Sequence, residues 1–570
     1  MRKQLLVLAI FLGAFGAKSQ NIDWLKNMEG LKNCEGKAIA IDHSGNVYTT
    51  GYFDSIMDFD PGVGTYTIPT NGSHEAFISK LDANGNFVWA KTIGDNGYAE
   101  GDAIKIDGSG NIITTGFFYG TVDFDPNSGT NILSSNSGDM FVSKLDANGN
   151  FIWAKNIGGT GFVAGTSLSI DNLNNILITG QFTGSADFDP GINTYQVTST
   201  NPNGNSDIFV TKLDISGNFL WAHGFGLDGL HQGTSIATDI LGNVFTTGYY
   251  HGSVDFDPSV NSYVLNSPSH DNAYILKLSS AGNFMWAKQF GDSTNHCYGF
   301  GITVDHSGNV YTTGSFSGSK DFDPDNGIYS LTSNVLSDTY ISKLDGSGNF
   351  IWAKNMGAAS GSGCSICIDK LGNVYISGVY RGSSDIDSGP GIYNLNSGTS
   401  FYNGITFISK SDSNGVVLSA KLFGSIDGSQ GSAIALDSAA NVFVTGFFQG
   451  NGTQVDFDPG PLTYTLNSTD RNSNFIVKLS PMISSGLEDI KNNKTNFIAI
   501  YPNPTSDFIT INSQKTITKI ELYNALGQLV FQNNNTSEKI NISFLTDGIY
   551  YVKVFFENSV SISKFVKQTN

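Results

Sequence analysis

Pairs of aspartates two residues apart are the residues of this sequence whose types and spacing best suit metal binding. Because side chains at positions i and i+2 of a strand point the same way, each pair can present two carboxylates together. Carboxylate oxygens are preferred ligands of Ca²⁺, so one hypothesis is a Ca²⁺ site, the only cofactor that the sequence suggests. The pairs lie in the motif DFDP and are Asp58 and Asp60, Asp123 and Asp125, Asp187 and Asp189, Asp255 and Asp257, Asp321 and Asp323, and Asp456 and Asp458.

A turn is the preferred interpretation of the same motif. Aspartate before proline commonly starts a turn through its side-chain acceptor. The calcium-loop pattern, which ends in a distal glutamate, is absent. The segment DANGN, at 82–86 and 146–150, could also bind calcium, but its sequence favours a hairpin turn.

Residues for nucleophilic or acid–base catalysis do not form a recognisable set. Glycosidases need paired carboxylates, and the region 20–480 contains few glutamates: Glu29, Glu35, Glu75 and Glu100. Serine-hydrolase and zinc-protease motifs are missing. Cys364 and Cys367 have C-x-x-C spacing but lie in a strand-like segment, so we interpret them as buried small residues. We assign no catalytic residue and leave enzyme activity open as the less favoured interpretation.

A long repeat positions all of these residues. The six tryptophans, at 24, 89, 153, 221, 286 and 352, are separated by 64 to 68 residues. The motif DFDP, or DIDS at 385, marks seven units. In the first unit, short alternating segments at 38–42, 47–53, 76–82 and 87–93 are separated by Gly/Asn turns, which predicts four β-strands. Antiparallel units of this length favour the blades of an all-β, seven-bladed β-propeller over a solenoid.

The two ends of the repeat region predict how the ring closes. The segment 21–26 aligns with 86–91, whereas the seventh unit ends at 475–480 without that outer strand. We therefore expect the first strand to complete the last blade of a propeller spanning 20–480, because closure hides open sheet edges. We also expect each tryptophan to pack against a neighbouring blade, and the ring to be weaker where Ser419 replaces tryptophan in unit six.

The repeat resembles a known bacterial family. DHSGNVYTTG at 42–51, followed by SKLDANGNFVWAK at 79–91, is similar to the seven-bladed beta-propeller (SBBP) repeat, and the likeness covers nearly all of 21–480. The resemblance implies the propeller fold. It implies little about biochemistry.

The C-terminal region begins after a polar segment, 481–496, which we interpret as a linker. Alternating segments within 497–570 predict a small β-sandwich. The region contains a set of distinctive residues, namely Tyr501, Pro502, Asn503, Pro504, Gly527, Gly548, Tyr550, Lys564 and Lys567. In these residues it resembles the type A sorting domain of the type IX secretion system of Bacteroidetes. The resemblance implies transport across the outer membrane by that machinery, followed by removal or exchange for a surface anchor.

Composition and the N-terminus indicate export. Arg2 and Lys3 precede an apolar run from Leu5 to Ala14 and then small residues, so 1–19 is predicted to be a signal peptide rather than a membrane span. The formal net charge is −19 and no basic cluster occurs, which disfavours a nucleic-acid partner. We expect a monomer without a transmembrane span, secreted or displayed at the cell surface by way of the periplasm.

The variable links between units are where a ligand is expected, because loops usually carry function while strands carry the fold. We therefore predict a binding or adhesion scaffold for an extracellular glycan or a surface protein, with Tyr98, Phe162 and Tyr298 suited to stacking on sugars. A polysaccharide-degrading hydrolase or lyase, and a structural repeat in a surface assembly, are the alternatives. The links are 94–102, 158–165, 226–233 and 291–301.

Overall fold

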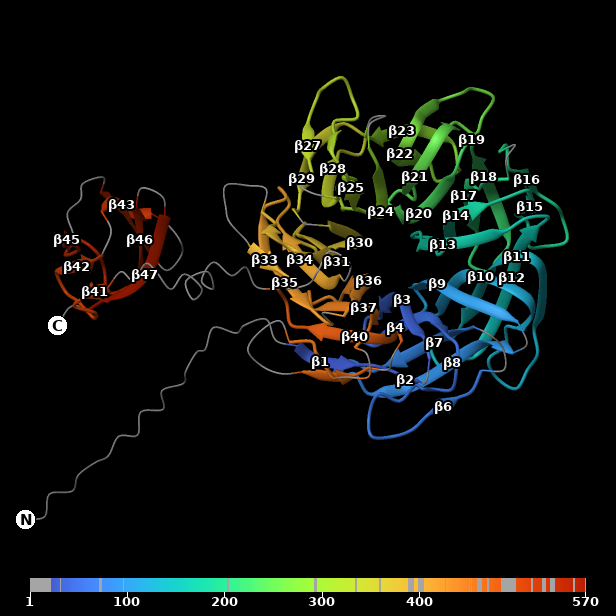
Figure 1. Cartoon of the computed structure of the whole chain (residues 1–570), viewed down its shortest axis with the longest axis horizontal. Coiled ribbons are helices and arrows are strands. Elements are labelled where there is room, and N and C mark those ends of the chain that lie inside the picture. Colours follow the sequence, from blue (N-terminus) through green and yellow to red (C-terminus); the bar gives the residue numbers. More distant parts are fainter. Residues whose placement is uncertain are drawn as a thin grey trace, which may run out of the picture. The chain divides into compact units, whose positions relative to one another are not determined.

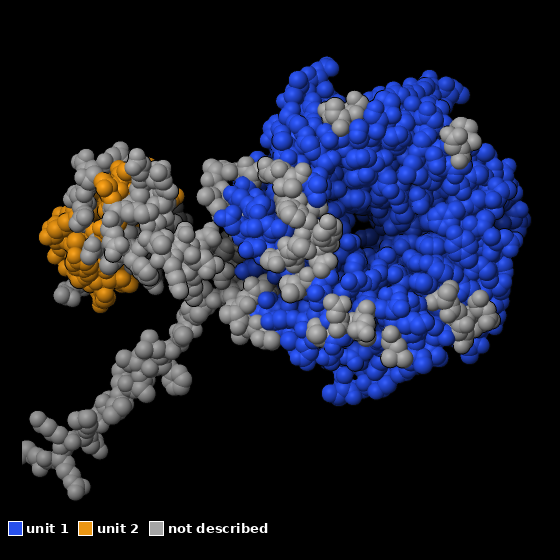
Figure 2. All heavy atoms as spheres, viewed as in Figure 1, with its two compact units in different colours: residues 1–483 blue, residues 484–570 orange. Residues whose placement is uncertain are grey.

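The structure, a computed structural model, divides into two compact units, 1–483 and 484–570, coloured separately in Figure 2. All regular structure in the described residues is β-strand, which confirms the predicted all-β class. The described residues are 22–482 and 499–568, without 31, 71–73, 96, 202–203, 292–294, 334–335, 358–359, 388–393, 398–403, 426, 451, 453, 459–463, 469–470, 514–515, 525–528, 534–538 and 557–558. The predicted signal peptide, and most of the predicted linker, lie outside them.

The main strands in the described part of the first unit form groups of four antiparallel strands, which we call blades one to seven in chain order. Blades one to three are β3 (Cys34–Ile41), β4 (Val47–Phe53), β7 (Glu75–Leu81) and β8 (Phe87–Asp95); β9 (Tyr98–Ile106), β10 (Ile112–Asp123), β11 (Ile132–Leu145) and β12 (Phe151–Gly159); and β13 (Val163–Ile170), β14 (Ile176–Phe182), β17 (Asp207–Leu213) and β18 (Phe219–Phe225). Blades four and five are β20 (His231–Thr238), β21 (Val244–Asp255), β22 (Val264–Leu278) and β23 (Phe284–Phe290); and β24 (Cys297–Val304), β25 (Val310–Phe316), β28 (Asp338–Leu344) and β29 (Phe350–Asn355). Blades six and seven are β30 (Ser360–Ile368), β31 (Val374–Arg381), β34 (Ile405–Ser411) and β35 (Val417–Phe423); and β36 (Ser429–Leu436), β37 (Val442–Phe448), β40 (Ser473–Leu479) and β1 (Ile22–Lys26). Pairing of β8 with β10 joins blades one and two into one continuous sheet.

Short strands at the edges of the blades carry the DFDP segments. In blades two and four, β10 with β11 and β21 with β22 simply extend to form these ribbons. Elsewhere these short strands are β5 (Met57–Asp58), β6 (Thr67–Ile68), β15 (Ser185–Asp187), β16 (Gln196–Thr198), β26 (Ser319–Asp321), β27 (Ser330–Thr332), β32 (Ser383–Asp385), β33 (Asn394–Asn396), β38 (Gln454–Asp456) and β39 (Thr465–Asn467). The link strands β2 (Glu29–Gly30) and β19 (Leu227–Asp228) pair with β5 and β21.

The blades are arranged around a centre, with the first strand of each blade innermost (Figure 1). Each inner strand contacts the next one in the order β3, β9, β13, β20, β24, β30 and β36, and β36 contacts β3. The N-terminal strand β1 pairs antiparallel with β40 of the last blade. The arrangement is a β-propeller, as the sequence predicts.

A glycine in each inner strand lets neighbouring blades approach closely. In β9, a Cβ atom on Gly101 would lie 2.2 Å from Oγ1 of Thr50 in the preceding blade, so no larger residue fits there. Thr50 is itself buried and donates its hydroxyl hydrogen to the carbonyl of Phe77 at 2.7 Å. This close approach fixes the direction in which the side chains on either side of the glycine point.

In most blades, a lysine and a tryptophan of the outer hairpin contact the next blade. Nζ of Lys80 donates to the carbonyl of Ala147 at 3.0 Å, and Nε1 of Trp89 donates to the same oxygen at 3.4 Å. Trp24 and Lys478, from opposite ends of the propeller, share the carbonyl of Ala83 in the same way. The prediction that the tryptophans pack against neighbouring blades is confirmed.

Blade six lacks this tryptophan for a structural reason. The next blade takes its outer strand from the N-terminus, so no continuous hairpin is available for an indole to cover. Lys410 of blade six instead donates to the carbonyl of Met482 at 2.8 Å, and the Met482 side chain is buried in the core of blade seven. Ser419, in the tryptophan position, is buried as well.

The second unit packs two sheets face to face, as predicted for a small β-sandwich. Its core contains isoleucines from the first sheet and Leu522, Val552 and Phe565 from the second. One sheet has the order β41 (Ala499–Tyr501), β42 (Phe508–Asn512) and β45 (Lys539–Asn541); the other has the order β44 (Leu529–Asn533), β43 (Ile517–Asn524), β46 (Gly548–Phe556) and β47 (Ser559–Lys567).

Candidate functional site

The DFDP aspartates organise turns. Oδ1 of Asp58 accepts the backbone N–H groups of Asp60 at 3.0 Å and Tyr66 at 2.8 Å, and Oδ1 of Asp60 accepts the N–H of Gly62 at 2.8 Å. The first aspartate thus closes an eight-residue loop, and the second caps the turn inside it. The same bonding to the first aspartate recurs at Asp123, Asp187, Asp255, Asp321 and Asp456 from the N–H groups of Asp125, Asp189, Asp257, Asp323 and Asp458.

This bonding gives a sufficient physical reason for the motif. One carboxylate oxygen of each leading aspartate is committed to two N–H donors, which hold the loop without a metal ion. Within the described ranges, no group of three His, Cys, Asp or Glu side chains has the geometry to hold a metal ion. Binding of Ca²⁺ by the DFDP aspartates stays a prediction.

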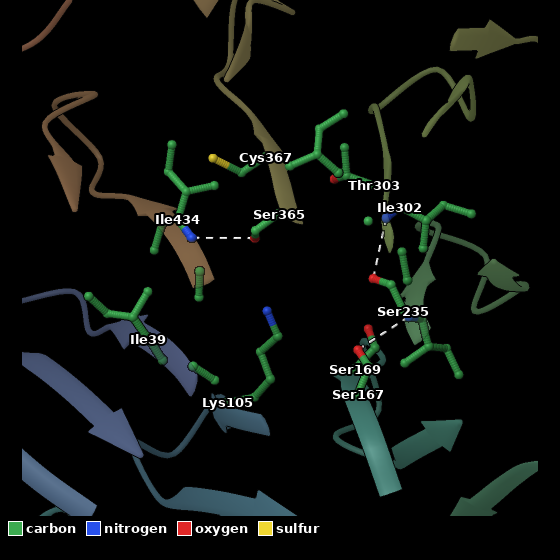
Figure 3. A pocket seen from close by; sticks show the side chains of 18 of the residues that line it. Ile39, Lys105, Ser167, Ser169, Ser235, Ile302, Thr303, Ser365, Cys367 and Ile434 are labelled. Atoms are coloured by element: carbon green, nitrogen blue, oxygen red, sulfur yellow. Dashed lines mark hydrogen bonds between the residues drawn. The ribbon is translucent and has the colours of Figure 1, made fainter. Parts of the chain in front are cut away.

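The inner strands enclose a central channel. Its cavity has a volume of about 560 Å³ and is lined by β3, β9, β13, β20, β24, β30 and β36 (Figures 2 and 3). Isoleucines such as Ile39 and Ile302 alternate there with serine and threonine hydroxyls. A cavity of this volume is in the range that accommodates small organic ligands.

The mouth of this channel is formed by the two residues that flank the inner-strand glycine. In blades three to seven these residues surround a second cavity of about 400 Å³ and are uncharged, namely Thr166, Gln232, Thr234, Phe300, Ser362, Cys364 and Gln430. In blades one and two the equivalent residues are Glu35, Lys37, Glu100 and Asp102. The seven-fold pattern is thus broken at one place, where charge is concentrated.

The charged residues of the mouth form one electrostatic group. Nζ of Lys37 lies 3.2 Å from Oε2 of Glu35. Burial lowers the pKa of Lys37, but the negative charges of Glu35, Asp102 and Glu100 outweigh burial and raise it. Burial, followed by the charge of Glu100, raises the pKa of Asp102 to about 7, against a smaller opposing effect of Lys37. Asp102 can therefore hold its proton close to neutral pH.

Aromatic rings from blades one to three continue this charged group outward. The ring centroids of His74 and Tyr98 are 4.7 Å apart, and those of Phe117 and Phe162 are 5.3 Å apart. The hydroxyl of Tyr98 donates to Glu100, so the rings and the acids share one surface. Tyr119 leaves 38% of its area exposed. We call Tyr52, His74, Tyr98, Phe117, Tyr119 and Phe162 the aromatic cluster.

The structure brings together two of the three aromatics predicted to contact a ligand. Tyr98 and Phe162 both belong to the aromatic cluster through Phe117. Tyr298 belongs to a separate group, where its hydroxyl donates to Asp271 at 2.8 Å and its ring lies 5.0 Å from that of Tyr249.

Sequence reasoning included Glu100 and Asp102 in the link 94–102 but did not single them out as an acid pair. Glu100 and Asp102 are two residues apart in β9, and this spacing can be read from the sequence. Neither residue belongs to a repeated motif. Comparison of the residues beside the inner-strand glycine from unit to unit would have found them. The tryptophan pattern is broken at Ser419 in blade six, whereas the charged residues that break the pattern of the mouth lie in blades one and two.

The cysteines have the character of buried packing residues. Cys34 and Cys297 are buried, and Cys364 and Cys367 are partly buried. Burial raises the pKa of both Cys364 and Cys367 to about 12, which disfavours the reactive thiolate.

Several residues that match the sorting signal lie in β46 and β47 or contact β47 in the second unit. The N–H of Val566 donates to Oδ1 of Asn503 at 2.9 Å, which fastens the segment Tyr501–Pro504 to β47. Tyr550 is buried, and its ring stacks on that of Phe565. Lys567 is buried, Gly548 begins β46, Lys564 lies in β47, and Gly527 is outside the described residues.

The comparisons agree with the two-part architecture. The family described as beta-propeller repeat (SBBP) matches residues 286–329, and the family described as secretion system C-terminal sorting domain matches residues 499–568. An uncharacterized WD repeat-containing protein of Acanthamoeba polyphaga mimivirus is 26% identical over 479 residues, covering 70% of this chain and 34% of that protein. This chain therefore matches about a third of the length of that relative.

Solved structures give weaker likenesses. PorZ, described as an essential bacterial surface component of the type-IX secretion system of Porphyromonas gingivalis, is 10% identical, with 96% of this chain and 100% of that chain covered at a TM-score of 0.17. Sqt1 from Chaetomium thermophilum is 12% identical, with 86% and 97% covered at a TM-score of 0.35.

No helix in the described ranges has the length and hydropathy to cross a membrane.

The sorting domain marks the protein for secretion or cell-surface display and implies contact with the secretion machinery. The chain therefore carries a β-propeller with an SBBP repeat, followed by a type IX secretion system C-terminal sorting domain.

Proposed function

We propose that this secreted propeller is a binding or adhesion protein for an extracellular carbohydrate, which it holds at the channel mouth of blades one and two. The observation that carries the proposal is the aromatic cluster beside hydrogen-bonding acids. Sugar rings present apolar C–H faces and a rim of hydroxyls, which suit aromatic faces and carboxylates respectively. Tyr119 supplies an exposed ring, and Glu35, Glu100 and Asp102 supply acceptors.

The position of the site supports the same proposal. The rings of the aromatic cluster come from β4, β9 and β10, from His74 directly before β7 and from the link before β13, so strands hold most of the rings. Rings that are already packed together lose little freedom when a ligand arrives, which favours binding. A display domain that is exported by its C-terminal tail would present such a surface to extracellular polymers.

Retention of the full chain on immobilised polysaccharides and glycans tests the proposal. Tyr98→Ala and Tyr119→Ala should lower retention on the glycan that binds, whereas Tyr329→Ala should not. Tyr329 is a suitable control because it is 37% exposed and its ring packs on Phe350, outside the aromatic cluster. Equal retention by all three variants would contradict the assignment of the site.

The same retention experiment, done with Ca²⁺ and with a chelator, tests whether the DFDP aspartates bind calcium. If the DFDP aspartates bind Ca²⁺ through the oxygens that the turns leave free, retention or thermal stability should depend on Ca²⁺ and fall with a chelator. Asp60→Asn should then remove part of the effect, since its remaining amide oxygen can still cap the turn. Identical behaviour with Ca²⁺ and with chelator would leave the aspartates as turn residues only.

A polysaccharide hydrolase or lyase is the second candidate, favoured by one observation. Asp102, with its pKa near 7, stands beside Glu100, and a protonated acid next to a carboxylate is the arrangement that glycoside cleavage uses. Release of soluble fragments from a bound polysaccharide, abolished by Asp102→Asn, would support the enzyme. Retention without fragments would support the binding protein.

A further inference from the structure

The central channel holds a lysine that the proposed function does not use. Lys105 extends from β9 into the cavity of about 560 Å³ (Figure 3). The other lysine of the channel lining, Lys37, is paired with Glu35. Lys105 forms no ion pair with a carboxylate in the part of the chain that the structure describes. The channel therefore contains an amino group whose positive charge the protein leaves uncompensated.

The surroundings of Lys105 make this charge costly. Lys105 is exposed to the solvent of the channel, whose wall the inner strands form, and desolvation by the surrounding protein lowers the pKa of Lys105. The nearby thiol of Cys367 has the opposite, weaker effect. The acids of the mouth act on Lys37 instead. An anion that entered the channel would supply the missing partner.

Serine hydroxyls around the channel can complete an anion site. Oγ of Ser167 accepts the N–H of Ile236 in the next blade at 3.3 Å. Since that oxygen is used as an acceptor, its hydroxyl hydrogen is the part left for a ligand. Two further inner strands repeat the arrangement, with Ser235 accepting from Ile302 and Ser365 from Ile434, both at 3.3 Å. Figure 3 shows these serines around the same cavity as Lys105.

We propose that the central channel binds a small oxyanion, a carboxylate or a phosphate, at Lys105 with the serine hydroxyls as additional donors. The amino group can only donate and the hydroxyls can donate, and no aspartate or glutamate is among the described residues that line the cavity, so the lining favours an anion. The cavity volume suits a small organic acid or phosphate ester. This site is separate from the aromatic cluster and does not rest on the proposed carbohydrate binding.

Competitive labelling of the full chain tests the site directly. The protein is treated with a trace of acetic anhydride alone, with inorganic phosphate or with succinate, and acetylation of each lysine is read by peptide mass spectrometry. We expect phosphate or succinate to protect Lys105 about threefold or more, because an ion-paired amine is a poorer nucleophile. Lys370, which is exposed, should be unaffected. Protection by one anion alone would identify the class, and protection by neither would overturn the proposal.

Two variants with the same change in net charge provide the matched control. Lys105→Met should raise the dissociation constant of the protecting anion, measured by calorimetry, about tenfold or more, since it removes the direct partner. Lys37→Met removes an equal charge from the same channel but should change the constant less than about threefold. Equal weakening by both variants would show a general charge effect and overturn the site. The labelling of the unaltered chain remains decisive if Lys105→Met does not fold.

Discussion

Replacing Lys144 by methionine should cost far more stability than the same change at Lys80, although the two lysines occupy equivalent positions. Both donate to a carbonyl of the following blade, at 3.2 Å and 3.0 Å. Lys144 also forms an ion pair of 2.8 Å with Asp107, whose side chain is 1% exposed. Lys80 instead lies 5.0 Å from the ring centre of Tyr48, whose hydroxyl donates to Asp42.

The magnitude follows from what each change leaves behind. Lys144→Met leaves the buried carboxylate of Asp107 without its cationic partner. Removing one partner of a buried ion pair costs about 3 to 5 kcal/mol. Asp107 keeps turn hydrogen bonds from Ser109 and Asn111, so we expect the lower end, about 3 kcal/mol. Lys80→Met loses a hydrogen bond and a cation–π contact, about 1 kcal/mol, while Asp42 keeps its tyrosine partner.

Urea unfolding followed by tryptophan fluorescence measures this difference. All six tryptophans lie in the first unit, so the signal reports the propeller and not the sorting domain. We expect Lys144→Met to unfold with about 2 kcal/mol less free energy than Lys80→Met. Equal costs would refute the assignment of the Lys144–Asp107 pair as a stabilising interaction.

The same pair predicts a pH dependence. Burial raises the pKa of Asp107, but the bond from Lys144 and those of the turn outweigh burial and lower it. The unfolded chain therefore binds this proton more readily than the folded chain, and the stability contribution is present above about pH 4 and lost as the pH falls through the folded pKa. The difference between the two variants should be full near neutral pH and shrink in acid. A constant difference down to low pH would exclude an ionic origin.

Further predictions concern closure, the mouth and export. Met482→Ala should lower the free energy of unfolding by about 2 to 3 kcal/mol in the same urea assay, because the side chain is fully buried, whereas Met285→Ala, at a position 47% exposed, should have little effect. For Asp102, burial and then Glu100 raise the folded pKa, so the folded state holds a proton between about pH 4 and 7 that the unfolded chain releases, and wild-type stability falls as pH rises. The melting temperature of Asp102→Asn relative to wild type should therefore increase from about pH 5 to about pH 8, and a flat difference would contradict the shifted pKa. A chain ended after 482 should stay in the periplasm of the producing cell while the full chain reaches the surface, as surface protease digestion would show, and equal exposure of both would refute the role of the sorting domain.

Local repetition explains why so much of the fold could be predicted. The segments at 47–53 and 76–82 coincide almost residue for residue with β4 and β7, since alternation and turn chemistry act within one unit. The tryptophan spacing indicated the contacts between blades for the same reason. Even the DFDP turns follow local rules, because their hydrogen bonds join residues at most eight apart.

The channel mouth could not be predicted because its parts come from different blades. Lys37 and Asp102 are 65 positions apart and meet only once the inner strands are placed side by side. The aromatic cluster joins links and strands of three blades, so no single unit contains it. The equivalent lysines Lys144 and Lys80 also have different partners, Asp107 and Tyr48 respectively. Which partner each lysine has depends on the residue that a neighbouring strand supplies.

Affinity electrophoresis of the full chain through gels containing the retained polysaccharide tests the central claim most directly. Wild type and Tyr329→Ala should be slowed to the same extent. A double variant, Tyr98→Ala with Tyr119→Ala, should lose most of the retardation, since stacking rings provide much of the binding energy at such sites. Undiminished retardation of the double variant would contradict carbohydrate binding at the mouth of blades one and two.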